Sequence, residues 1–119
     1  HVKNLYLRDR KKRNFLVITQ EDRAVDLKSL QGDIAADRLS FGSPDRLFEF
    51  LGVRPGAVSL FTLVNDTSHQ VQLALDSSLL QADRIYFHPL VNDLTLGVTP
   101  DDIHAFLTLT GHQPRIITL

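Results

Sequence analysis

The chain has 119 residues, of which 43% are hydrophobic, a formal net charge of −1 and no cysteine. This length is typical of one domain, and the apolar content is sufficient for a hydrophobic core. The lack of cysteine excludes disulfides, thiolate metal sites and thiol catalysis, and no apolar run is long enough to predict a membrane-spanning helix or a signal peptide. We therefore expect a cytoplasmic protein that does not enter a membrane.

The pattern of apolar residues predicts a hairpin at the start of the chain. Alternation over residues 2–7 indicates a strand with its odd-numbered residues, Lys3 among them, on the core face. Residues 9–14 form a charged turn, and the continuous apolar run of residues 15–19 is typical of a central strand.

Positive charge is concentrated around this turn. Residues 1–28 carry eight Lys or Arg and four Asp or Glu, whereas residues 29–119 carry five and ten. A dense cluster of cations can contact the phosphates of a nucleic acid, but it can also be a solvated hairpin tip. The candidate phosphate-binding residues are Arg8, Arg10, Lys11, Lys12 and Arg13.

Capping signals predict two helices in the next part of the chain. Asp26 can cap a short helix that ends at Gly32. Ser43, followed by Pro44 at the first helical position, begins a second helix that ends at Gly52.

The central stretch, residues 53–67, combines a turn with an apolar run. Pro55 fixes its own φ, and Gly56 can adopt a positive φ or let another molecule approach the backbone. The run over residues 60–64 predicts a buried strand that ends in turn residues. The glycine turn can hold a small polar group on its backbone, or it can be an ordinary connecting loop.

Short strands and two further helices complete the chain. Residues 76–80 can form one helical turn, and Thr99 is the N-cap of a clear helix that ends at Gly111. His112 is interpreted as a capping and packing residue. Because strands and helices mix without a regular βαβ alternation, the pattern predicts a single α+β domain with a mixed or largely antiparallel sheet. The additional strands are expected over residues 39–41, 71–75, 84–88, 94–98 and 115–119.

Three segments occur in an order and spacing that resemble a known family. They are the segment that begins with Lys3-Asn4, the central stretch, and residues 87–93, which read Phe-His-Pro-Leu-Val-Asn-Asp. Together they resemble the YbaK/prolyl-tRNA-synthetase-associated editing domains, and most of all their free-standing ProX (PrdX-like) branch, over residues 3–119. The resemblance implies a curved mixed sheet, partly barrel-like, with helices packed around it. It also implies that residues 1–119 are an editing domain without an N-terminal segment that helps to cover the pocket.

The resemblance assigns catalytic roles to Lys3, Gly56 and His88. Lys3 would hold the terminal nucleotide or orient the ester, and the amides of the glycine loop would stabilise the oxyanion. His88 would border the aminoacyl pocket and position the substrate. Judged without the resemblance, Lys3 can also be a lysine at a sheet edge, and His88 a structural residue at a strand end.

The resemblance also marks a set of substrate-binding residues. Leu60 stands where the family's Gly-x-x-x-Pro loop has proline, which puts the shape of the loop in doubt. Asn92 and Thr95 also fit the family pattern and can simply shape their loop. The substrate-binding set is Asn4, Ala57, Val58, Ser59, Leu60, Phe61, Asn65 and Asp66.

The implied function is a trans-editing hydrolase that deacylates mischarged tRNA(Pro), with Ala-tRNA(Pro) as the expected substrate, by water attack on the aminoacyl ester. Two alternatives stay open: a Cys-tRNA(Pro) deacylase, and a domain that binds tRNA or a synthetase without hydrolysis. The expected partners are aminoacylated tRNA(Pro) and prolyl-tRNA synthetase, with no DNA. No cofactor or metal is expected, because there is no P-loop, no GxGxxG and no histidine pair at metal-site spacing.

Overall fold

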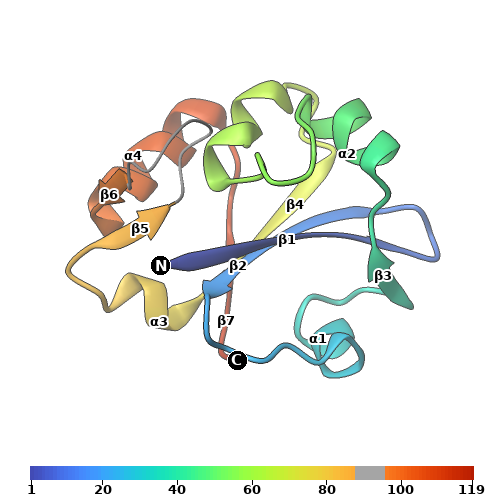
Figure 1. Cartoon of the computed structure of the whole chain (residues 1–119), viewed down its shortest axis with the longest axis horizontal. Helices are drawn as coiled ribbons and strands as arrows, with labels where there is room; N and C mark the ends of the chain where they lie inside the picture. The colour runs from blue at the N-terminus through green and yellow to red at the C-terminus, as the bar shows by residue number, and fades with distance from the viewer. Residues whose placement is uncertain (88–95) are drawn as a thin grey trace.

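The computed structural model describes residues 1–87 and 96–119, and an antiparallel hairpin runs through its centre (Figure 1). The hairpin consists of β1 (Val2–Asp9) and β2 (Asn14–Gln20). β2 is buried along nearly its whole length because it lies between β1 and β4 in the sheet and is covered on both faces. The predicted hairpin and its central second strand are therefore confirmed.

Among the residues that the structure describes, the main sheet has five strands in the order β3-β1-β2-β4-β7. β3 (Leu39–Phe41) pairs antiparallel with β1, whereas β4 (Val71–Asp76) and β7 (Arg115–Ile117) continue parallel from β2. A separate antiparallel pair joins β5 (Ile85–Phe87) to β6 (Leu96–Val98). The predicted α+β class and mixed sheet are confirmed. The sheet is not a closed barrel, because β3 and β7 are its two edges in the described part of the chain.

Within residues 1–87 and 96–119, four α-helices pack around the sheet: α1 (Leu27–Asp33), α2 (Pro44–Leu51), α3 (Ser77–Leu80) and α4 (Pro100–Thr110). Each begins directly after a residue whose side chain accepts a hydrogen bond from the first helical turn, as the capping signals predicted. These N-cap residues are Asp26, Ser43, Asp76 and Thr99. No helix within the described residues has the length and hydropathy needed to cross a membrane.

The helix ends agree with the sequence except in α1. Gly52 and Gly111 follow α2 and α4 in the left-handed conformation, with φ of 70° and 81°. Gly32 does not end α1, and this prediction was wrong. The helix continues to Asp33, because Ile34 extends the apolar spacing from Leu30 and both side chains are buried against the sheet.

The sheet is covered on both faces, by two separate clusters of buried side chains. α2 and α4 contribute to the cluster that contains Val2 and Tyr6 of β1, whereas α1 contributes to the cluster that contains Leu7. Figure 1 shows α1 and α2 on opposite sides of the hairpin. Lys3 shares the α1 side with Leu7 by strand alternation, as predicted, but the α2 side of β1 is buried as well.

The apolar run after the glycine turn is a 3₁₀ helix, η1 (Leu60–Asn65), so the predicted buried strand is wrong. The Ser59 hydroxyl caps it by accepting a hydrogen bond from the amide of Phe61 at 3.2 Å. Leu60 and Leu63 are fully buried, whereas Val64 is 60% exposed. Burial at i and i+3 is the period of a 3₁₀ helix, and a short apolar run cannot distinguish this from a strand.

Candidate functional site

The glycine turn is a tight reversal at the end of the loop that follows α2. The amide of Ala57 donates to the carbonyl of Arg54 at 3.0 Å, and Gly56 has φ of 92°. A type II turn requires a positive φ at its third position, which Gly56 provides, and often has proline at its second, where Pro55 lies. A Cβ added to Gly56 would meet no atom within 4 Å, so the space beside its backbone is open.

This turn lines a cavity of about 390 Å³ together with β1. Lys3 and Asn4 lie in its lining with Gly56 and Val58, although more than 50 residues separate the two segments in the sequence. The structure therefore brings together four of the predicted site residues. The other lining residues are Val2, Tyr6, Glu21, Gly42, Pro44, Leu47 and Pro55.

Lys3 is half-buried, and its ammonium group has a protein partner. Its Nζ donates to the backbone carbonyl of Arg23, just beyond the end of β2. A buried ammonium without a partner would be costly, so this contact helps to explain how a lysine can lie in this wall. An ammonium group has three donors, which leaves two for other acceptors.

Asn4 presents an acceptor with no partner among the described residues. Its Oδ1 is buried, and no described group donates a hydrogen bond to it. Buried polar side-chain atoms in proteins are nearly always hydrogen-bonded, so an unpaired acceptor in the lining of a cavity suggests a ligand donor.

Tyr6 and Gly42 form a part of the wall that the sequence did not reveal. The Tyr6 hydroxyl donates to Oδ1 of Asn14 at 2.6 Å, and burial raises the pKa of Tyr6 against the opposing charge of Arg8. The tyrosine therefore stays neutral and fixed in orientation. Its ring lies against Gly42, whose amide donates to the carbonyl of Tyr6 at 3.0 Å.

Four of the predicted substrate-binding residues around η1 lie outside the cavity lining. Ser59 caps η1 and Leu60 is buried in the core. Phe61 packs edge-on against Phe87 and Phe106, with ring centroids 5.3 and 5.2 Å apart. Ala57 closes the glycine turn with its amide.

The last two members of the set hold elements together. The side chain of Asn65 donates to the carbonyl of Leu51 at 2.8 Å, which joins η1 to the end of α2. Asp66 is buried and accepts from Nε2 of His112 at 2.9 Å, in keeping with the packing role expected for that histidine. His88, Asn92 and Thr95 lie outside the described residues, so their predicted roles stay predictions.

Comparison with known proteins identifies the family. The family model described as the aminoacyl-tRNA editing domain matches residues 1–106. The chain belongs to this family. It is 37% identical over 119 residues to the prolyl-tRNA editing protein ProX of Acetoanaerobium sticklandii, across 99% of this chain and 73% of that protein. It is 35% identical over 122 residues to the Mus musculus prolyl-tRNA synthetase associated domain-containing protein 1, across 98% and 72%.

A solved structure of low sequence identity has the same fold as this editing domain. It is described as a candidate trans-editing enzyme for prolyl tRNA synthetase, and it matches with a TM-score of 0.71 at 21% identity, across 99% of this chain and 69% of that chain. The resemblance inferred from the three sequence segments is confirmed. The expected class of enzyme, an aminoacyl-tRNA deacylase that hydrolyses an ester, is confirmed by membership of the family.

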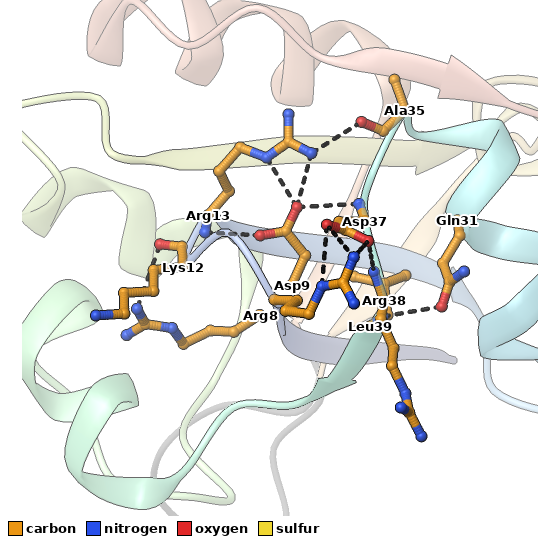
Figure 2. A network of polar contacts seen from close by, with 10 residues as sticks. Arg8, Asp9, Lys12, Arg13, Gln31, Ala35, Asp37, Arg38 and Leu39 are labelled. Atoms are coloured by element: carbon orange, nitrogen blue, oxygen red, sulfur yellow. Dashed lines mark hydrogen bonds and ion pairs between the residues drawn. The ribbon is translucent and has the colours of Figure 1, made fainter.

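The cationic hairpin tip of the editing domain is braced by two acidic residues (Figure 2). The guanidinium of Arg13 contacts the carboxylate of Asp9 at 2.7 Å, and that of Arg10 contacts Asp37 at 3.3 Å. Two of the five predicted phosphate-binding cations thus have internal partners. Lys11 and Lys12 are exposed on the turn between them.

Arg8, the fifth of these cations, also has contacts within the protein. Its guanidinium lies over the ring of Phe50, 5.4 Å from the ring centroid, and one nitrogen donates to the carbonyl of Lys12 at 3.2 Å. Contact with phosphates therefore remains a prediction for all five residues, with Lys11 and Lys12 the best placed.

Acid should weaken the fold through Asp9. Burial raises the pKa of this carboxyl, but hydrogen bonds from the amides of Arg13 and Asp37 and from the Arg13 guanidinium outweigh it, so the pKa lies below its usual 3.8. A lowered folded-state pKa gives stability that is present above the unfolded pKa and lost as the pH falls through the folded pKa. Urea unfolding at a series of pH values should therefore show stability decreasing below about pH 4.

The Asp9→Asn variant is the control for this effect. It should be less stable than the wild type at neutral pH and should lose less stability on acidification, because the group that titrates is gone. Equal acid losses in the two proteins would contradict the assignment to Asp9.

Proposed function

We propose that this editing domain is a trans-editing hydrolase that deacylates mischarged tRNA(Pro), with Ala-tRNA(Pro) as its substrate. The observation that supports this most directly is that Lys3 and Gly56 line one open cavity. Both residues contribute to the lining, and an ammonium group turned toward the glycine backbone would suit an ester carbonyl that develops negative charge during hydrolysis. The partners in this proposal are aminoacylated tRNA(Pro) and prolyl-tRNA synthetase, after which several relatives are named.

The chemistry requires no covalent intermediate, since an aminoacyl ester is already activated. The oxygen of a water molecule bonds to the ester carbonyl carbon, and the bond from that carbon to the ribose oxygen then breaks. The proton lost by the water passes to the departing ribose oxygen, directly or through the neighbouring ribose hydroxyl. The products are the free amino acid and uncharged tRNA. In this proposal Lys3 and the glycine turn stabilise the oxyanion that forms between the two steps.

The cavity wall offers contacts for the rest of the amino acid. Oδ1 of Asn4 is the acceptor that an α-ammonium group or a ribose hydroxyl would need. Val58 and Leu47 provide apolar surface for a small side chain. A synthetase pocket built for proline cannot strongly exclude smaller residues, so removal of alanine at a second site follows the logic of a double sieve.

One contact favours the alternative, a domain that binds charged tRNA or a synthetase without hydrolysis. The ammonium of Lys3 is bonded to the Arg23 carbonyl, which draws it toward the end of β2. A catalytic role requires Lys3 to keep this contact while its remaining donors face the ester, or to exchange it for the substrate.

Loss of Lys3 distinguishes these functions. The purified protein is incubated with Ala-, Cys- and Pro-charged tRNA(Pro), and the remaining ester is measured over time. We expect Ala-tRNA(Pro) to be consumed fastest. Lys3→Ala should slow the reaction about 10–100-fold, the value of one hydrogen bond from a charged group.

Lys28→Ala is the matched control, because Lys28 is exposed on α1 and does not line the cavity. It should retain the wild-type rate. If no charged tRNA is lost beyond spontaneous hydrolysis, the non-catalytic alternative is correct. If Cys-tRNA(Pro) is consumed fastest, the activity is that of a cysteine editor, and equal rates for wild type and Lys3→Ala would refute the site.

A further inference from the structure

An exposed arginine lies over the ring of an exposed phenylalanine beside the cavity. The guanidinium carbon of Arg54 is 4.3 Å from the centroid of the Phe48 ring, and the phenylalanine is 49% exposed. A surface pair of this kind contributes little to folding. It does, however, place a planar cation and a half-exposed aromatic ring together at the surface.

The pair lies at the rim of the proposed ester site. Phe48 follows Leu47 and is four residues after Pro44, and both of those residues line the cavity from α2. Residues i and i+4 share one helix face, so Phe48 continues this face beyond the lining. Arg54 immediately precedes Pro55 and Gly56, which line the cavity from the other side.

The backbone that positions Arg54 is itself fixed. Gly52 reverses the chain in the left-handed conformation at the end of α2, and Asn65 holds the carbonyl of Leu51. A Cβ added to Gly52 would lie 3.2 Å from Nδ2 of Asn65, so the reversal is closely packed. A closely packed turn, rather than a flexible loop, therefore positions Arg54 beside α2.

We propose that Arg54 and Phe48 form a stacking platform for an unpaired nucleobase at the acceptor end of the tRNA. This inference rests on the proposed function, because it places the ester in the adjoining cavity. The base of the nucleotide that carries this ester is then separated from it only by the ribose, which places the base next to the rim. Aromatic rings and arginine planes stack on bases of any sequence, and the positive charge of Arg54 also complements the phosphates beside the base.

The test uses uncharged tRNA(Pro) that carries 2-aminopurine in place of the terminal adenine, whose fluorescence falls when it stacks. Wild-type protein should quench the probe as it binds. Phe48→Ala and Arg54→Ala should each weaken binding about tenfold and reduce the quench, as expected for loss of one stacked base. Phe48→Tyr should retain both signals, because its ring can still stack.

Arg115→Ala is the charge-matched control, since Arg115 lies on β7 and does not line this cavity. It should bind as the wild type does. A second probe with pyrrolocytosine at the penultimate position shows which nucleotide stacks, and a quench at either position that depends on Phe48 supports the platform. No quench at either position, or equal binding by all variants, would overturn it.

The readout is independent of catalysis, because the probes carry no amino acid. A quench that depends on Phe48, in a protein that hydrolyses no charged tRNA, would leave the platform intact and refute only the proposed function. If Phe48→Ala weakens binding to prolyl-tRNA synthetase but not to the probes, the pair is a protein contact and the platform is refuted.

Discussion

Asp66→Ala should destabilise the fold by about 3–5 kcal/mol, because it leaves three hydrogen-bond donors without their acceptor, each at a cost of about 1–3 kcal/mol where it is buried. The Asp66 carboxylate is 4% exposed and accepts three hydrogen bonds, each 2.9 Å long. Its donors are the amides of Gln70 and Val71 and the Nε2 of His112. Alanine would leave all three donors without this acceptor in the protein interior, and each carries its own desolvation penalty.

The effect should be large because Asp66 joins three elements. It follows η1, its amide donors lead into β4, and His112 lies just beyond α4. The measurement is the midpoint of urea unfolding. Asp83→Ala, at an exposed aspartate, is the control and should change stability by less than about 0.5 kcal/mol.

The same variant tests the substrate-binding role that the sequence assigned to Asp66. If Asp66→Ala unfolds at the wild-type urea concentration but no longer hydrolyses charged tRNA, the role at the site is correct and the structural account is wrong. Loss of stability together with activity would favour the structural account. The sequence could not choose between them, because His112 is 46 residues away and no local pattern links the two.

Helix starts were predictable because their signals are short in range. Ser43 and Thr99 cap their helices through amides only three residues ahead, and each is followed by proline at the first helical position. The chain around η1 carries no such signal. Its apolar residues are contiguous, so burial at Leu60 and Leu63 but not at Val64 is decided by packing against other elements.

The site was predictable only in part, and for a different reason. Strand alternation placed Lys3 on a buried face, but it was the resemblance to the editing family that brought Lys3 and Gly56 together. Tyr6 and Leu47 were missed as cavity residues, because the way α2 packs against β1 determines which of their atoms reach the lining. No local rule gives that packing.

Gly42→Val should destabilise the domain by about 3 kcal/mol, at the upper end of the cost of overpacking, and should also impair hydrolysis. A Cβ added to Gly42 would lie 2.1 Å from a ring carbon of Tyr6, well inside van der Waals contact. The ring cannot easily move away, because its hydroxyl is bonded to Asn14 and the tyrosine is buried. Either Tyr6 leaves the cavity wall or the end of β3 separates from β1.

Gly32→Val is the matched control. A Cβ at Gly32 would meet no atom within 4 Å, and valine is no worse than glycine inside a helix, so stability and hydrolysis should both be retained. The pair is compared by urea unfolding and by the rate of loss of Ala-tRNA(Pro). In the double variant Gly42→Val/Tyr6→Leu, a smaller side chain replaces the tyrosine ring. This should restore part of the stability but not the rate of hydrolysis, because Tyr6 also shapes the cavity beside Asn4. If Gly42→Val has the stability and hydrolysis rate of the wild type, the cavity wall can deform at no energetic cost. Such a cavity could not select substrates by size.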